Sequence, residues 1–237
     1  MKRQVVDVTE GSALAAVASS LVYAIEDSLL EAEIDSSAIH VYPPPWEALA
    51  SGESSFSFEV YGVRELEQRE ARVEGLELTV SVRRARGSPP PGSAPLREVY
   101  LSVARLVPRL DAGLLKSLSR ETWETGVEHL VLYALDGRVY VLEGEKGSAL
   151  ILPVRAASVI HTHPGGACGL SSRDVRIAAR LLDSYVIASS AVSENCLYYL
   201  VRLGPISLDD YTLLLNYSSD LLEELSLRTV RGGRLYL

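Results

Sequence analysis

The segment Gly87-Ser88-Pro89-Pro90-Pro91-Gly92-Ser93-Ala94-Pro95 is the feature that most restricts how this chain can fold. Three consecutive prolines favour the extended polyproline II conformation and are excluded from helix interiors and central strands. We therefore predict a linker over residues 87–95 that separates two modules. The chain has 237 residues, 47% of them apolar and 23% charged, which suits a globular protein of one or two domains.

Charge is distributed unevenly between the two sides of this linker. Residues 1–95 carry 8 basic and 15 acidic side chains, whereas residues 96–237 carry 15 and 16. The net charge of −8 argues against a protein that coats nucleic acid, since such a protein needs a basic face. The acidic front module could meet a basic partner or could keep the protein in solution, and we favour the second interpretation.

Targeting signals are not evident in the sequence. No apolar run reaches the about 18 residues that a transmembrane helix needs, and the N-terminus does not have the pattern of a secretion signal. We therefore expect a cytoplasmic protein that binds neither a membrane nor nucleic acid.

The front module is predicted to be a small α+β domain of unknown role. Apolar residues at three- and four-residue steps predict a helix over residues 12–34, with Ser12 as its N-cap. Alternating apolar residues predict strands at residues 56–61, 76–82 and Val5–Val8. The module has no cysteine and no glycine-rich phosphate loop, so recognition, regulation and a purely structural role all stay open.

The second module mixes strands with helices. We predict strands at residues 99–107, 130–135, 138–143, 157–160, 185–189 and 197–203, and helices at residues 111–123, 171–183 and 208–227. Asp136-Gly137 fits a hairpin turn between two of these strands. The mixture of elements predicts an α/β or α+β fold.

The stretch from His161 to Asp174 carries the strongest chemical signal. Residues two apart in a strand point to the same face, so His161 and His163 can direct two imidazoles at one metal ion. Ser171 is placed to cap the next helix, and Asp174 in the first turn of that helix can supply a third ligand.

Two histidines and one carboxylate around an open position are the ligands of a catalytic zinc ion. Zinc lowers the pKa of a bound water towards 7, and a carboxylate off the metal is needed to move its proton. A Ser-x-x-Asp sequence alone is an ordinary capping box, and a His-x-His pair alone is a weak signal. The joint pattern is expected by chance only on the order of 10⁻⁵ times in such a chain, so we interpret it as a metal site.

His161-Thr162-His163-Pro164, followed by Ser171 and Asp174, resembles the JAMM motif of the MPN+ zinc metalloproteases. These enzymes are isopeptidases that release ubiquitin-like modifiers, and archaeal and bacterial relatives act on ubiquitin-like or sulfur-carrier proteins. The resemblance covers about residues 97–205 and implies an MPN fold, an α/β sandwich similar to cytidine deaminases. Leu170 departs from the pattern, because the family usually has proline before the motif serine.

The resemblance also implies roles for individual residues. The metal ligands for Zn²⁺ fall on His161, His163 and Asp174, and the residue that stabilises the oxyanion falls on Ser171. The family's general base is a glutamate at the start of the strand after the first helix, which Glu128 fits best, with Glu121 and Glu124 as alternatives. The implied substrate is a ubiquitin-like or sulfur-carrier protein.

The resemblance divides the chain into a front domain at 1–86, the linker at 87–95, a metalloprotease-like domain at 96–206, and a C-terminal helix and tail at 207–237. Cys168 lies in the metal loop, where we expect a packing role or a disulfide with Cys196. We interpret His129 as structural and Gly232-Gly233 as a flexible end.

Three other functions compete with the metalloprotease prediction. A non-catalytic MPN-type scaffold and a RadC-like protein stay as alternatives, although the complete ligand set argues against the first and the acidic front module against the second. A nucleobase deaminase does not fit, because His-x-Glu and Pro-Cys-x-x-Cys are both missing from the sequence.

Overall fold

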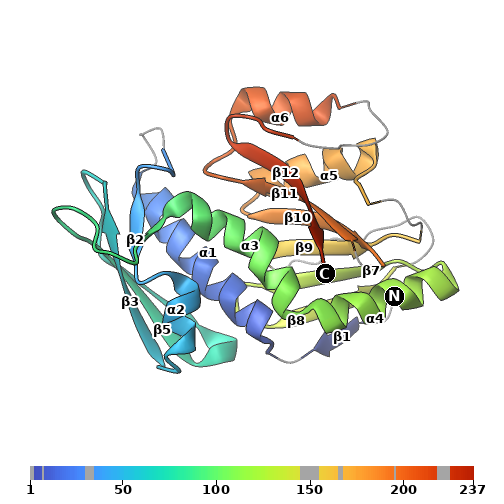
Figure 1. Ribbon diagram of the computed structural model, residues 1–237, viewed down its shortest axis with the longest axis horizontal. Helices are drawn as coiled ribbons and strands as arrows, with labels where there is room; N and C mark the ends of the chain where they lie inside the picture. The colour runs from blue at the N-terminus through green and yellow to red at the C-terminus, as the bar shows by residue number, and fades with distance from the viewer. Residues whose placement is uncertain are drawn as a thin grey trace.

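The computed structural model describes residues 3–6, 8–29, 35–144, 155–164, 168–194, 196–217 and 225–237 (Figure 1). The helices are α1 (Glu10–Ser28), α2 (Pro45–Ala50), α3 (Leu96–Leu110), α4 (Ala112–Thr125), α5 (Ser172–Asp183) and α6 (Leu208–Leu215), with a short 3₁₀ helix at Glu74–Leu76. The strands are β1 (Arg3–Val6), β2 (His40–Tyr42), β3 (Ser55–Tyr61), β4 (Arg69–Val73), β5 (Leu78–Arg84), β6 (Ala94–Pro95), β7 (His129–Ala134), β8 (Val139–Glu143), β9 (Ala156–Thr162), β10 (Ala188–Ser193), β11 (Cys196–Arg202) and β12 (Val230–Tyr236).

The strands form two mixed sheets, which makes the fold α+β as predicted. A seven-stranded sheet has the order β1-β8-β7-β9-β10-β11-β12, and only its β9–β10 pair is parallel among the described pairs. A five-stranded sheet has the order β4-β5-β3-β2-β6, with β3 and β5 parallel. The hairpin of β7 and β8 is the one predicted at Asp136-Gly137.

Strand β1 was assigned to the wrong module from the sequence. It pairs with β8, with Arg3 opposite Leu142 and Val6 opposite Val139, and so extends the seven-stranded sheet. A strand is predicted at Val5–Val8 and is observed at Arg3–Val6, so the two overlap at Val5 and Val6. The partner of a strand is fixed by long-range contacts that local pattern does not record.

Helix α1 lies between the two sheets (Figure 1). Its apolar side chains are buried on all sides of the helix, and they belong to one continuous core that runs from Phe58 of β3 to Ile160 of β9. A helix that is apolar all round is expected in such a central position. The N-cap is Thr9 rather than the predicted Ser12, which instead completes the capping box as the third helical residue. Residues 30–34 of the predicted helix lie outside the described residues.

Helix α3 replaces the strand predicted at residues 99–107. The run Val99-Tyr100-Leu101 favoured a strand because β-branched and aromatic residues are common there. The fully buried positions of the element are nevertheless spaced three and four residues apart: Leu96, Val99, Tyr100, Val103, Ala104 and Val107. Charged residues such as Arg105 and Arg109 are exposed on the opposite side, which is the pattern of an amphipathic helix.

The C-terminal part also differs from the prediction. The last helix ends at Leu215, and residues 218–224 of the predicted helix lie outside the described residues. Gly232 and Gly233, expected in a flexible end, are inside β12, which pairs with β11 over seven residues. A Cβ atom at Gly233 would lie 2.7 Å from the Tyr199 hydroxyl oxygen, so the glycine leaves room for the tyrosine side chain of β11 to lie over β12.

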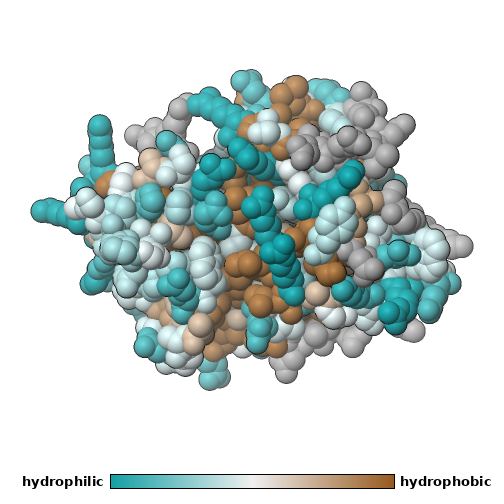
Figure 2. All heavy atoms as spheres, viewed as in Figure 1, coloured by the Kyte–Doolittle hydropathy of each residue, from teal (hydrophilic) through white to brown (hydrophobic). Residues whose placement is uncertain are grey.

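Helix α6 covers α5 with one side and leaves the other in solvent. Leu214 is buried in the apolar cluster that also contains Val175 and Ala178 of α5, whereas Leu208 and Leu213 are exposed. Figure 2 shows hydrophobic atoms over this helix at the top of the molecule. Within the described residues, no helix combines the length and the apolar character required to cross a bilayer.

Candidate metal centre

The two motif histidines lie at the end of β9, in the middle of the seven-stranded sheet. His161 is opposite Leu130 of β7 and Ala191 of β10. The backbone N–H of His163 donates to the carbonyl oxygen of Val192 at 2.9 Å, so the chain stays extended one residue past the strand. Alternation along this extended segment puts both imidazoles on one face, with their Nε2 atoms 2.9 Å apart.

Asp174 joins the histidines because of the way α5 begins. Ser171 is the N-cap, and its hydroxyl accepts a hydrogen bond from the N–H of Asp174 while its own N–H donates to Asp174 Oδ2. This capping box turns the carboxylate back towards the end of β9. Oδ1 then lies 3.5 Å from His161 Nε2, and Oδ2 lies 3.4 Å from His163 Nε2. The structure therefore brings the three predicted ligands together.

The spacing of the three side chains fits a zinc ion. Tetrahedral zinc with ligands at 2.0–2.1 Å has ligand atoms about 3.3 Å apart. The two Nε2 atoms are 2.9 Å apart, and Asp174 Oδ1 lies 3.5 Å from His161 Nε2, so both separations are close to this value. Two imidazole nitrogens and one carboxylate oxygen are also the donor types that zinc prefers. The ligand side chains are 18–20% exposed, so the cluster is open to solvent on one side.

Electrostatics at the cluster favour a bound cation. Burial raises the pKa of Asp174, but hydrogen bonds from His161 and His163 outweigh it and hold this pKa well below its ordinary value. The carboxylate is therefore ionised at neutral pH. The Nε2 atoms of the two histidines face each other, so one neutral imidazole can donate to the other through its Nε2–H tautomer, whereas a shared metal ion would require the lone pair of both Nε2 atoms.

The strand register places Glu128 on the face of the imidazoles. Leu130 is opposite His161, and directly opposed residues of an antiparallel pair share a face. Glu128 is two residues before Leu130, and its carbonyl oxygen accepts from the N–H of Gly144 at 2.8 Å, which continues the β7–β8 ladder. The Glu128 side chain is exposed, and it lies on this face one residue before the start of β7.

The two alternative glutamates, Glu121 and Glu124, belong to α4 on the other face of the sheet. Glu121 Oε2 lies 3.8 Å from Nε2 of His129, whose ring is buried on the side away from His161. The burial of His129 agrees with its interpretation as a structural residue. Sequence reasoning did not identify Thr122 and Thr162, which contact His129. Their contact with His129 depends on the pairing of β7 with β9 and on the packing of α4 behind these strands, which no local sequence pattern records.

Cys168 and Cys196 form a disulfide, one of the two roles expected for Cys168. It joins the loop before Ser171 to the start of β11, with the two Cα atoms 5.7 Å apart. A cysteine in a disulfide is not a thiolate ligand, so Cys168 adds no donor atom to the cluster of His161, His163 and Asp174.

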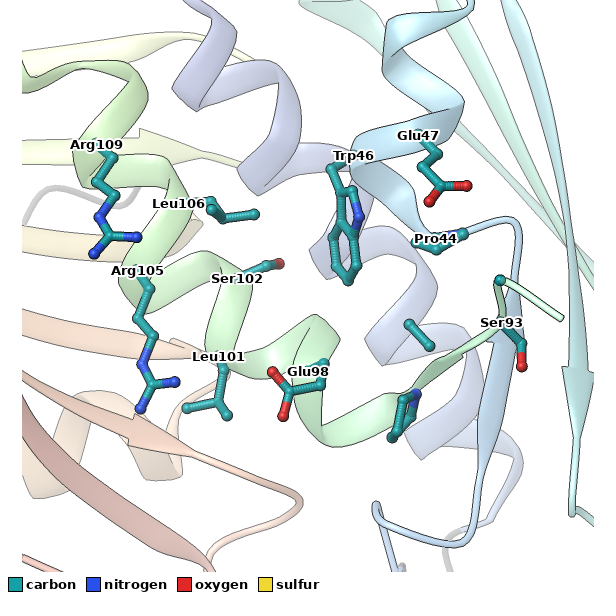
Figure 3. Close-up of a pocket in the computed structure, with 13 residues that line it drawn as sticks. Pro44, Trp46, Glu47, Ser93, Glu98, Leu101, Ser102, Arg105, Leu106 and Arg109 are labelled. Carbon is teal, nitrogen blue, oxygen red and sulfur yellow. The ribbon is translucent and has the colours of Figure 1, made fainter.

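A separate groove of about 380 Å³ lies between α2 and α3 (Figure 3). Trp46 faces Leu106 across it, and Arg105 and Arg109 project from one side of α3. Arg105 Nε donates to the Tyr199 hydroxyl at 2.7 Å. Tyr199 packs in the core shared with α1 and α3, on the face of the sheet away from the imidazoles, so this groove is distinct from the metal cluster.

Comparison of the chain with models of protein families, with curated proteins and with solved structures finds no match.

Proposed function

We propose that this protein is a zinc-dependent metallopeptidase or isopeptidase. Its substrate is the peptide or isopeptide bond that follows the C-terminal tail of a ubiquitin-like or sulfur-carrier protein, and its fold is of the MPN type, similar to cytidine deaminases. The observation that carries the proposal is the convergence of His161, His163 and Asp174, whose ligand atoms all lie within 4.8 Å of one another. The resemblance of this motif to the JAMM pattern supplies the reaction class.

Each proposed residue has a defined task. A zinc ion held by His161, His163 and Asp174 supplies a Lewis acid and a water of near-neutral pKa. Glu128 takes the proton of the attacking water and returns it to the leaving amine. Because Oδ2 of Asp174 already accepts two hydrogen bonds from Ser171, Oδ1 is the oxygen available to a metal.

Ser171 is proposed to donate to the oxyanion of the tetrahedral intermediate. Its hydroxyl donates to Asp174 Oδ2 at 2.6 Å in this structure. The oxyanion role therefore requires the hydroxyl to rotate from the carboxylate to the substrate, which needs only a change in one side-chain torsion of an exposed residue.

The proposal is tested by metal content and cleavage measured together. The purified full-length protein, loaded with zinc and desalted, is expected to retain about one zinc ion per chain. It is also expected to cleave a fusion in which a ubiquitin-like protein precedes a reporter. His163→Ala is expected to lose both properties. His40→Ala is the matched control, because His40 lies on β2 in the other sheet. Wild-type protein that retains no zinc would contradict the proposal.

A further inference from the structure

A ring of hydrogen bonds lies directly behind the two metal-ligand histidines. The backbone N–H of His129 donates to Thr162 Oγ1 at 2.7 Å, and Thr162 Oγ1 lies 2.6 Å from Thr122 Oγ1. Thr122 Oγ1 in turn lies 3.0 Å from His129 Nδ1, which closes the ring. Thr122 and Thr162 are fully buried and His129 is 5% exposed, so water does not compete for these bonds.

The hydrogen bonds of the ring can run in two directions, and in only one of them does each hydroxyl hydrogen find an acceptor among the described contacts. Thr162 donates to Thr122, Thr122 donates to His129 Nδ1, and Thr162 accepts from the His129 backbone. In the reverse direction the hydroxyl hydrogen of Thr162 would have no acceptor in the ring. The favoured direction requires His129 to carry its proton on Nε2, which is the atom that faces the Glu121 carboxylate at 3.8 Å.

The ring joins the elements that carry the proposed catalytic groups. Thr162 lies between His161 and His163 in the sequence, and its side chain points to the opposite face. Holding the Thr162 side chain in place therefore also fixes the orientation of the backbone from which both imidazoles project. His129 directly follows Glu128 at the start of β7. The ring therefore holds the end of β9 against the start of β7, and α4 contributes Thr122 from behind.

We infer that Thr162 and Thr122 are positioning residues that hold His161 and His163 in a zinc-binding arrangement and set the position of Glu128 relative to them. The inference rests on the proposed zinc site. Neither threonine contacts the metal or the substrate. They act on the ligands through the backbone of β9, in the way that residues outside the coordination sphere orient ligands in other metal sites.

The test measures zinc affinity and the absorption spectrum of the Co²⁺-substituted full-length protein. Thr162→Val keeps the shape and the strand preference but removes the hydroxyl. We expect zinc affinity, measured by competition with a chelator, to fall about 10- to 100-fold, and the Co²⁺ bands to broaden and shift. Thr162→Ser restores the hydroxyl and is expected to recover both. Ser158→Ala is the control, because Ser158 is fully buried on the same face of β9 and its hydroxyl has no partner among the described residues.

Thr122→Val provides a second variant that leaves β9 unchanged, in case Thr162→Val does not fold. It is expected to weaken zinc binding in the same direction, with kcat reduced more than KM is changed. Zinc affinity and Co²⁺ spectra that stay at wild-type values in both folded variants would overturn the inference. Wild-type protein that binds no zinc would instead overturn the proposed function.

Discussion

Two clusters of polar side chains on the seven-stranded sheet differ in exposure and in how their charges are balanced. We call the partly exposed one the open cluster and the buried one the closed cluster. At the end of β9, His161, His163 and Asp174 meet where each side chain is about one-fifth exposed. Between α1 and β11, the guanidinium of Arg202 bonds to Glu26 in the protein interior, with side-chain exposures of 3% and 10%.

The second cluster contains its own cation. Arg202 also lies 5.7 Å from the ring centroid of Tyr100, whose hydroxyl donates to Glu26. The carboxylate of Glu26 is therefore paired with a cation and hydrogen-bonded within the fold, as a buried charge must be. In the first cluster the described partners of Asp174 are two imidazoles and Ser171. The comparison teaches that a closed cluster stabilises the fold, whereas a cluster assembled from metal-binding donors is suited to an added ion.

The largest expected effect is on the open cluster. Glu128→Gln removes the proposed base but leaves the ligands intact, so cleavage should fall about 10²- to 10⁴-fold while zinc content stays near one per chain. Glu124→Gln, on α4 at the other face, is the control and should keep wild-type activity. Steady-state cleavage of the fusion substrate measures both. Equal activity of Glu128→Gln and wild type would remove Glu128 from the mechanism.

The next effect belongs to the closed cluster. Arg202→Met leaves the Glu26 carboxylate buried without its cation, and the free energy of unfolding should fall by about 3–5 kcal/mol. The double variant Arg202→Met/Glu26→Gln should be more stable than the single variant, because no uncompensated charge is left. Urea denaturation measures stability. Zinc affinity of the folded protein should stay unchanged in both variants, and a parallel loss of zinc would show that the clusters are coupled.

Tyr23 also belongs to the closed cluster, because the guanidinium of Arg202 lies 5.9 Å from the centroid of its ring, and it should make the stability of the protein depend on alkaline pH. Burial raises the pKa of Tyr23 to about 12, above its ordinary value of 10.0. A phenol with a raised pKa contributes stability fully below pH 10, and this contribution is lost as the pH rises towards 12. Between pH 9 and pH 11.5, wild type should therefore lose about 2 kcal/mol more stability than Tyr23→Phe. Tyr236→Phe, at an exposed position, is the control. Identical losses in wild type and Tyr23→Phe would contradict the assignment.

The smallest effect concerns the cap that orients Asp174. Ser171→Ala should lower the free energy of unfolding by about 1 kcal/mol, the usual value of an N-cap, and should also weaken zinc binding. Ser207 caps α6 in the same way, through a hydrogen bond from Asp210 N–H, but lies outside the cluster. Ser207→Ala should therefore cost similar stability without a change in zinc affinity. Zinc binding that responds equally to both variants would show that the cap does not act through Asp174.

Features that depend on neighbouring residues were predictable from the sequence. Alternation put His161 and His163 on one face, and the Ser-x-x-Asp spacing fixed the start of α5 and the place of Asp174. These contacts lie within a short stretch of chain. The same reasoning identified the hairpin of β7 and β8.

Features that depend on long-range pairing were not predictable. The partner of β1, the strand at Gly232-Gly233 and the ring through Thr162 all require knowing which distant segments meet. Helix α3 was predicted as a strand because Val99 and Tyr100 have strand preferences, which burial against α1 and the seven-stranded sheet overrides. The face on which Glu128 lies follows from register, which residue spacing alone does not give.

The central position of α1 has a consequence for how the molecule can be divided. A protease that cuts within Gly87–Pro95 would sever the chain but not the core, because α1 and β1 from one fragment complete the packing of the other. The nicked halves would stay together as a noncovalent pair, and a gene truncated to residues 96–237 would yield a sheet that lacks its edge strand β1 and lacks α1, one of the helices that cover its inner face. The half that carries His161, His163 and Asp174 therefore depends on the front of the chain in order to fold.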